Sequence, residues 1–191
     1  MFSGATFLCI LVAVTAQSRR RDPNAYAEDY RNFPLQRLSA MTNQSKRIYV
    51  LMRDYNLSTP FDCHSAKKVH QYSDNEYEYE LKARINWTKF YSYNVSMTAM
   101  KTGNHSEPND AYYEEDKGAG KIDHKLMTTN YDRTCFVFAV NISSERFGCI
   151  LAVTEDILDA QYRARTCKYV YRRYCGIQSI KLYKDNCRNT V

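Results

Sequence analysis

The sequence lacks the short motifs that mark common enzyme active sites. It contains no glycine-rich phosphate loop and no G-x-S-x-G nucleophile elbow. Aspartates and glutamates are abundant, but no two of them are singled out by position as a catalytic acid and base. We therefore expect a protein that is not an enzyme and that uses no cofactor.

Signals for metal binding are missing as well. There is no C-x-x-C pair, and the four histidines, at positions 64, 70, 105 and 124, do not have the spacing of zinc ligands. Long apolar runs are absent after residue 16, so no later segment is expected to cross a membrane. The sequence thus predicts neither a metal site nor a membrane span in the mature chain.

The one long apolar run is MFSGATFLCILVAVTA, at the N-terminus. It carries no charge, is short for a membrane span, and places Val14 and Ala16 at the small-residue positions of a signal-peptidase site. We predict a signal peptide over residues 1–16 and hence a secreted, extracellular protein. The alternative is a retained membrane anchor, which the basic QSRRR that follows would favour.

Cysteine usage agrees with secretion. Cys9 leaves with the signal peptide, and an even number in an oxidising compartment predicts three disulfides. Six cysteines allow 15 pairings, and spacing alone does not choose among them. The remaining cysteines are Cys63, Cys135, Cys149, Cys167, Cys175 and Cys187.

N-glycosylation sequons are also frequent. In a secreted chain each predicts an exposed position that can carry a glycan. The six acceptor asparagines are Asn43, Asn56, Asn86, Asn94, Asn104 and Asn141. A net charge of +6 and 17 tyrosines are compatible with nucleic-acid binding. The charges are dispersed, however, and glycans would obstruct a polyanion, so we expect no nucleic acid partner.

Residues 76–88, EYEYELKARINWT, alternate between polar and apolar side chains. Such alternation indicates a strand with two different faces, and the sequon at Asn86 places the polar face outside. The other face, from Tyr77 to Trp87, then looks either into a filled core or into a cavity. Similar runs make a row of about eight strands, typical of a sandwich or an up-and-down barrel. The expected strands are residues 47–55, 64–72, 76–87, 90–100, 111–115, 121–130, 135–142 and 147–154.

Helices are expected only near the two ends. Asp22 as a cap and Pro23 at the first helical position predict a short helix within an N-terminal segment, residues 17–45. After the last strand, Thr154 and the acids that follow it predict a helix over 155–163. A second helical piece is expected over 165–174, and IQSIKLYKDNC closes the chain as a short strand.

The cysteine frame resembles that of the tick salivary lipocalins, the histamine-binding-protein family. The matching motifs are FDC, YDRTCFVFAV, FGCILAV, ARTCKYVYRRYC and KDNC, in that order. The resemblance implies an eight-stranded antiparallel lipocalin barrel over residues 46–191, with a C-terminal helix. It also implies the pairs Cys63–Cys187, Cys135–Cys167 and Cys149–Cys175. In the chain-entropy model the first bridge, which closes a loop of over 100 residues, contributes roughly 4–5 kcal/mol.

The resemblance implies one of two functions for a monomeric barrel in tick saliva. Members of the family bind small host mediators inside the barrel, among them histamine, serotonin, leukotrienes, thromboxane and fatty acids. Others bind a host protein such as a complement component through the outer surface. We expect sequestration of a mediator that drives host inflammation or haemostasis, a form of immune evasion, and the surface inhibitor remains the alternative.

The interior expected from the sequence favours a lipid over an amine. Amine-binding members carry an acidic residue directly after the cysteine that matches Cys135, and a Glu-Leu-Trp-like run on the next strand. Here Phe136 follows that cysteine, and Ile150, Leu151 and Ala152 replace the run. An ammonium ion that leaves water needs a charged partner, so we expect histamine and serotonin to bind poorly.

Alternation, oriented by the sequons, selects the residues expected to line the cavity. They are Tyr79, Leu81, Ile85, Tyr93, Phe136, Phe138 and Ile150. Alternation does not orient Arg53: facing inwards it would hold a lipid carboxylate, but an arginine near a strand end is more commonly at the rim or paired outside. His124 similarly is expected to be a satisfied wall residue rather than a ligand contact.

Overall fold

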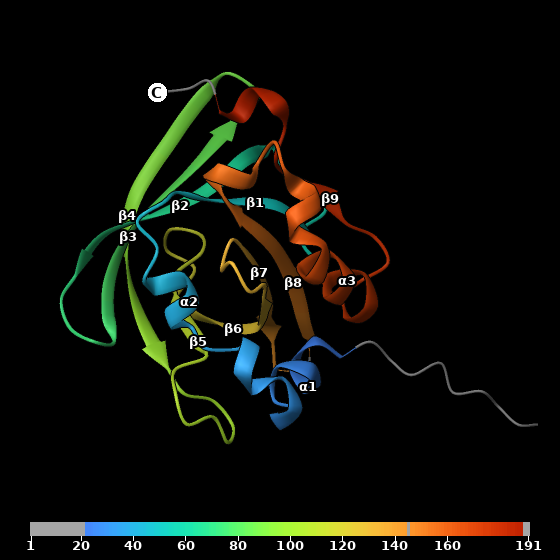
Figure 1. The fold of residues 1–191 in the computed structure, drawn as a ribbon. Helices are drawn as coiled ribbons and strands as arrows, with labels where there is room; N and C mark the ends of the chain where they lie inside the picture. The colour runs from blue at the N-terminus through green and yellow to red at the C-terminus, as the bar shows by residue number, and fades with distance from the viewer. Residues whose placement is uncertain (1–21, 145, 189–191) are drawn as a thin grey trace, which may run out of the picture.

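The computed structural model describes residues 22–144 and 146–188 (Figure 1). The predicted signal peptide, Cys9 and the QSRRR flank lie outside the described residues. Within the part of the chain that the structure describes, no helix is both long enough and apolar enough to cross a membrane.

The chain forms a closed antiparallel β-barrel (Figure 1). Each strand from β2 to β7 pairs with the next one along the chain, and β8 pairs with β1. The barrel closes where Ile48 and Tyr49 of β1 pair with Ala66 and Ser65 of β2. The strands are β1 (Ile48–Arg53), β2 (Phe61–Gln71), β3 (Glu76–Ile85), β4 (Lys89–Met100), β5 (Asp110–Tyr113), β6 (Ile122–Thr129), β7 (Cys135–Ser143) and β8 (Arg146–Thr154). The eight predicted strands are confirmed, with small differences at their ends.

Strand β3 shows how alternation builds the wall. It pairs with β4 in one unbroken register from Glu76↔Thr98 to Ile85↔Lys89, and Tyr77 and Tyr79 point inwards and are buried. Trp87 departs from the prediction, because it lies in the β3–β4 turn with φ of 66° and is 64% exposed. A left-handed backbone ends the strand alternation, so the side chain no longer belongs to either face.

Two apolar layers share the wall formed by β7 and β8. Phe136, Phe138 and Ile150 belong to a cluster inside the barrel. Val137 and Leu151 belong to a second cluster between the outer wall and the C-terminal helix. Because both faces of these strands are buried, their sequences are continuously apolar rather than alternating.

The N-terminal segment closes one end of the barrel. Helix α1 (Pro23–Ala27) begins as predicted, with the Asp22 carboxylate accepting a hydrogen bond from the backbone N–H of Ala25 at 2.9 Å. A 3₁₀ turn, η1 (Tyr30–Leu35), and helix α2 (Ser39–Thr42) follow. Leu38 and Ala40 reach into the interior cluster, so this end of the barrel is filled by side chains.

The C-terminal region corrects one prediction. Residues 155–163 do not form a helix but contribute to two separate 3₁₀ turns, η2 (Glu155–Ile157) and η3 (Gln161–Ala164). Thr154 is not a side-chain cap, because its backbone N–H and its hydroxyl both bond to the carbonyl oxygen of Thr134. The second predicted helix is confirmed as α3 (Arg165–Tyr174), which lies against β6, β7 and β8. The short elements β9 (Ile180–Lys181) and η4 (Asp185–Cys187) complete the described chain.

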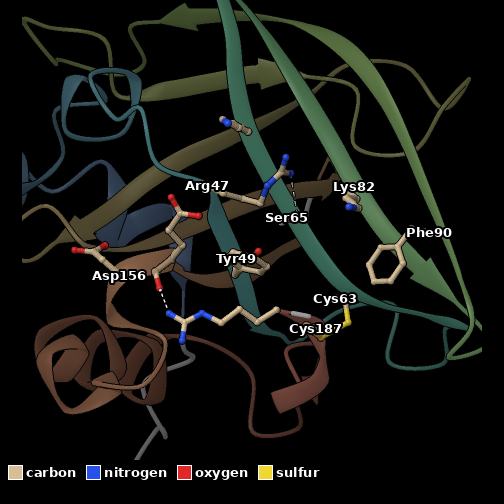
Figure 2. A pocket seen from close by; sticks show the side chains of 11 residues that line it. Arg47, Tyr49, Cys63, Ser65, Lys82, Phe90, Asp156 and Cys187 are labelled. Carbon is tan, nitrogen blue, oxygen red and sulfur yellow. Dashed lines mark hydrogen bonds between the residues drawn. A yellow bond between two sulfur atoms is a disulfide. The ribbon is translucent and has the colours of Figure 1, made fainter. Parts of the chain in front are cut away.

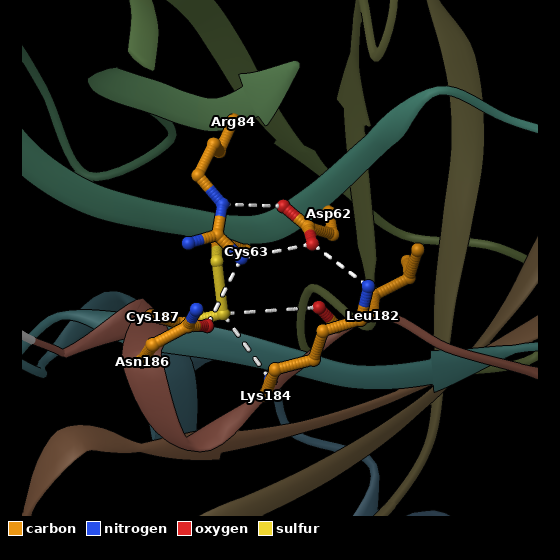
Figure 3. Close-up of a disulfide and its surroundings, with 7 residues drawn as sticks. All are labelled: Asp62, Cys63, Arg84, Leu182, Lys184, Asn186 and Cys187. Atoms are coloured by element: carbon orange, nitrogen blue, oxygen red, sulfur yellow. Dashed lines mark hydrogen bonds and ion pairs between the residues drawn. A yellow bond between two sulfur atoms is a disulfide. The ribbon is translucent and has the colours of Figure 1, made fainter. Parts of the chain in front are cut away.

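Three disulfides tie this region to the barrel: Cys63–Cys187, Cys135–Cys167 and Cys149–Cys175. They are the pairs that the family resemblance implies. Around the first bridge, Asp62 accepts hydrogen bonds from Arg84 at 2.8 and 2.9 Å and from Lys184 at 2.9 Å (Figure 3). Arg84 therefore lies on the polar face of β3, as expected, but is buried beneath the C-terminal segment.

The predicted glycan acceptors occupy two kinds of position. Five of the six asparagines are exposed, and Asn141 is half-buried on the outer wall. Its side-chain amide donates a hydrogen bond to Asp123 at 3.2 Å. Glycosylation itself stays a prediction at each sequon.

Candidate functional site in the barrel

The interior of the barrel is lined by apolar and aromatic side chains from all eight barrel strands, and β5 supplies Ala111 and Tyr113 near the mouth. Of the predicted lining residues, four are buried in the interior cluster: Tyr79, Phe136, Phe138 and Ile150. Leu81 and Tyr93 lie at its margin and are half-buried. Ile85 is not part of the cluster, because it is the last residue of β3 beside the exposed turn.

The strand registers explain why distant residues meet here. Phe138 pairs with Ile150 on β8 and with Leu126 on β6, and the Phe136 and Phe138 rings lie 6.4 Å apart. Residues directly opposite on antiparallel strands project to the same face. A continuous apolar surface therefore runs across β6, β7 and β8 on the inner side.

The second end of the barrel, which we call the mouth, is bordered by loops. They are the connection after β1, the β3–β4 turn, the β7–β8 turn and the loop over residues 114–121. The opposite end is the one that Leu38 and Ala40 fill. Charged side chains are buried just inside the mouth, which the sequence did not predict.

Arg53 is the first member of this buried cluster. It is only 4% exposed and donates to Glu115 Oε1 at 3.2 Å and to the backbone oxygen of Asn56 at 3.3 Å. Of the two orientations that the sequence left open, the structure shows the inward one. The β1–β8 register shifts between Val50 and Met52, and this irregularity exchanges the faces, so that Arg53 pairs with Ile150 on the inner side.

Glu115 is the centre of the cluster. Its carboxylate accepts the hydroxyl of Tyr55 at 2.7 and 2.8 Å and lies 3.6 Å from Nε2 of His124. Burial by itself raises the pKa of this carboxyl. The close approach of His124, the hydrogen bond from Tyr55 and the charge of Arg53 more than offset burial and lower the pKa to about 2. Glu115 is therefore an anion at physiological pH, and it adds a buried carboxylate to the apolar and aromatic interior that the sequence predicted.

Two histidines face the same cluster. His124 is fully buried and stacks on the ring of Tyr113 at 4.1 Å, which places it in the wall as expected but within reach of Glu115. Burial, assisted by the nearby charge of Arg53, lowers the pKa of His64 to about 4. His64 is thus neutral at physiological pH, which limits the positive charge of the mouth.

Several buried polar atoms on the inner side of the barrel have no hydrogen-bond partner among the described residues. They are Nε of Arg53, Nε2 of His64 and of His124, and the hydroxyl of Tyr79. Unpaired polar groups cost free energy when buried, so such groups often mark the place of a bound polar atom. The mouth can therefore offer hydrogen bonds to a polar ligand group, next to the apolar interior cluster.

Sequence reasoning missed Glu115, although a signal was present. Ala111, Tyr113 and Glu115 have the same parity, and the first two project into the barrel. Strand alternation continued by one step would have placed Glu115 inside as well. The strand ends at Tyr113, yet the carboxylate still reaches the interior.

A hollow of about 590 Å³ lies on the outer wall near the Cys63–Cys187 bridge (Figure 2). The residues that line it include Tyr49, Phe90, Arg47 and Arg188. Both arginines are already paired with carboxylates, those of Glu80 and Asp159. Among the described residues that line this hollow, none has a buried polar side-chain atom without a partner, so the mouth is the stronger candidate.

Comparisons with known proteins agree with the lipocalin architecture. Residues 26–189 match a family model described as tick histamine binding protein, whereas no curated protein matches the sequence. Japanin from Rhipicephalus appendiculatus, solved bound to cholesterol, superposes with a TM-score of 0.52 at 13% identity, covering 75% of this chain and 96% of that one. Lobster apocrustacyanin A1 superposes with a TM-score of 0.57 at 12% identity, covering 88% of this chain and 89% of that one. The serotonin complex of AM182 superposes with a TM-score of 0.56 at 12% identity, covering 85% of this chain and 91% of that one. At these identities the likeness shows the fold alone.

Proposed function

Because the chain belongs to the tick histamine-binding protein family, we propose that it sequesters a small amphipathic host mediator, a lipid such as a leukotriene or fatty acid, inside its barrel. The observation that carries the proposal is an apolar and aromatic barrel interior that ends at a buried arginine with an unpaired Nε. In this function the protein lowers the free concentration of the mediator and performs no chemistry on it.

The two ends of such a ligand match the two parts of the site. The hydrocarbon part would lie against Tyr79, Phe136 and Phe138, where apolar burial contributes roughly 25 cal/mol per Å² before the costs of association. The polar end would lie at the mouth, near Arg53 and the hydroxyl of Tyr93. The guanidinium of an arginine suits a carboxylate because it offers parallel N–H donors.

An amine fits this interior less well. Phe136 and Ile150 belong to the interior cluster and are buried. They stand at the positions where amine-binding members are acidic. Glu115 supplies a carboxylate elsewhere, but Arg53 already neutralises it. The fold does not choose between the two classes, since one structural relative is bound to cholesterol and another to serotonin. The inward residues of this chain favour the lipid.

Native mass spectrometry of the secreted protein, combined with displacement of a fluorescent fatty acid, tests the proposal. We expect a bound lipid-sized mass, or saturable fatty-acid binding at one site per chain. Absence of any lipid binding would reject the barrel as a lipid site. The surface inhibitor of a host protein, for example a complement component, would then become the function to test.

A further inference from the structure

The loop over residues 114–121, between β5 and β6, is attached to the barrel through Glu115. The Glu115 carboxylate is held by Arg53 and Tyr55, and its backbone oxygen accepts the hydroxyl of Tyr93 at 2.6 Å. Beyond it, residues 116–121 are exposed. The carboxylate of Glu114 accepts the backbone N–H groups of Gly118 and Gly120 at 2.8 and 3.0 Å. The loop thus folds on itself through Glu114 and reaches into the mouth through Glu115.

The two partners of the buried ion pair differ in their freedom to move. Arg53 lies on β1, where it pairs with Ile150 of β8 and with Ile180 of β9. Glu115 lies two residues after the end of β5, on a loop whose tip is in solvent. Moving Arg53 would break the barrel wall, whereas moving Glu115 requires only that the loop shift outwards. An exchange of partners at the mouth must therefore keep Arg53 and replace Glu115.

This asymmetry decides the charge of the ligand that the mouth can accept. An anion can take the place of the Glu115 carboxylate on Arg53 while Glu115 moves into water, so every charge remains solvated or paired. An ammonium ion that took Glu115 would leave Arg53 buried without a counter-charge, which is strongly unfavourable. The unpaired Nε of Arg53 adds a donor that suits an anion.

We propose that Glu115 occupies the binding position of the ligand's anionic head, and that a ligand carboxylate displaces it from Arg53 and thereby releases the 114–121 loop. Glu115 is then a specificity-determining residue and the latch of an entry gate. In the ligand-free protein Glu115 is the counter-charge of Arg53, so neither charge is buried without a partner. A ligand that binds Arg53 must compete with Glu115 for it. This inference rests on the proposed function, because it concerns the same site in the barrel and specifies an anionic head for its ligand.

Replacing Glu115→Gln tests the competition. The amide keeps the size of the side chain but removes the charge that competes for Arg53. We expect oleate to bind about tenfold more tightly to this variant than to the wild type, since a hydrogen-bonded charge is no longer displaced. Oleyl alcohol has the same tail and no charge. We expect its affinity to differ by less than about threefold between the variant and the wild type, because exchange of partners at Arg53 contributes little to its binding.

Asp116→Asn is the matched control. Asp116 is the next residue in the same loop and is exposed, and it has no hydrogen bond to Arg53. The variant removes an equal charge near the mouth, and we expect it to change oleate affinity by less than about twofold. An equal gain in both variants would show general electrostatic attraction and would overturn the latch.

Hydrogen exchange on the wild-type protein gives a second readout that does not depend on a variant folding. Oleate should speed exchange at the amides of Gly118 and Gly120, while oleyl alcohol should not. If oleate binds but neither affinity in Glu115→Gln nor loop exchange changes, the latch is rejected and the proposed function stands. If neither compound binds to either protein, the proposed function itself fails.

Discussion

Phe138 shows how a single interior residue controls the room available to a ligand. It lies near the middle of β7, is buried, and contacts the interior cluster between Leu126 and Ile150 on the neighbouring strands. Protein interiors are packed as densely as organic crystals, so one added ring must displace something. In a site that binds a lipid, the displaced material is the ligand.

We therefore expect Phe138→Trp to weaken fatty-acid binding by about tenfold, a loss of about 1.4 kcal/mol. Glu78→Gln, on the polar outer face of β3, should bind as the wild type does. The measurement is displacement of a fluorescent fatty acid by both variants under the same conditions. Unchanged displacement by the tryptophan variant would show that the ligand does not contact this part of the barrel.

His64 makes a prediction about stability and pH. Its pKa is lowered from 6.5 to about 4 by burial and by Arg53, while Glu115 and Asp62 act in the opposite direction. Below pH 6.5 the unfolded chain binds a proton at this residue that the folded chain does not, so stability falls as pH decreases towards 4. From pH 7 to pH 5 this residue should account for a loss of about 2 kcal/mol.

Guanidinium denaturation at both pH values, without reductant, measures this loss. The variant His64→Gln should lose less stability than the wild type between pH 7 and pH 5. The exposed His70, replaced in the same way, serves as the control and should leave the pH dependence unaltered. A pH dependence that persists in full without His64 would assign the loss to other groups.

At the scale of elements, the C-terminal segment is held to the barrel by a bridge and an ion-pair network. The Cys63–Cys187 bond joins residues 124 positions apart, whereas Cys149–Cys175 joins residues 26 apart. Lys184 and Arg84 meet Asp62 beside the first bridge (Figure 3). Since η4 and β9 are short, these links rather than secondary structure hold the segment in place.

Removing the longer bridge should therefore cost more stability than removing the shorter one. In the chain-entropy model, loss of Cys63–Cys187 costs roughly 5 kcal/mol and loss of Cys149–Cys175 roughly 3.5 kcal/mol. Paired cysteine-to-alanine variants, compared by chemical denaturation, measure the difference. Equal losses, or a larger loss for the shorter bridge, would show that strain or packing rather than loop closure decides its contribution.

At the scale of the whole molecule, the barrel combines one filled end with one polar mouth. Its inward carboxylate is paired with Arg53, and the side chains of the interior cluster are apolar or aromatic. A biogenic amine bound inside the barrel would therefore find no free carboxylate to neutralise its charge. The charge of the whole chain, +6, likewise does not attract a cation.

We expect histamine and serotonin to bind poorly in calorimetric titration. Leaving a buried charge without a partner costs about 3–5 kcal/mol, enough to raise a dissociation constant by about two to four orders of magnitude. Oleate, titrated under the same conditions, provides the positive control. Submicromolar affinity for histamine would show that Glu115 exchanges Arg53 for the amine, contrary to the direction inferred for the mouth.

The sequence by itself determined the features that repeat or that are local. Period-two alternation, interrupted by turn residues, gave eight strands, because side chains of a strand must alternate between faces. Sequons oriented Phe136, Phe138 and Tyr93 towards the inside, where the structure places them. The family resemblance supplied the cysteine pairs, which spacing alone could not assign.

The tertiary structure alone decided the features that depend on where a strand pattern is interrupted and on which distant segments pack against that strand. A register shift in β1 turned Arg53 inwards, the end of β5 left Glu115 on a loop that still reaches it, and the C-terminal segment buried Arg84. The structure also shows two 3₁₀ turns where the sequence predicted one helix over residues 155–163. Local periodicity carries no information about register shifts or about contacts between residues more than 60 positions apart, and the Arg53–Glu115 pair at the mouth arises from both.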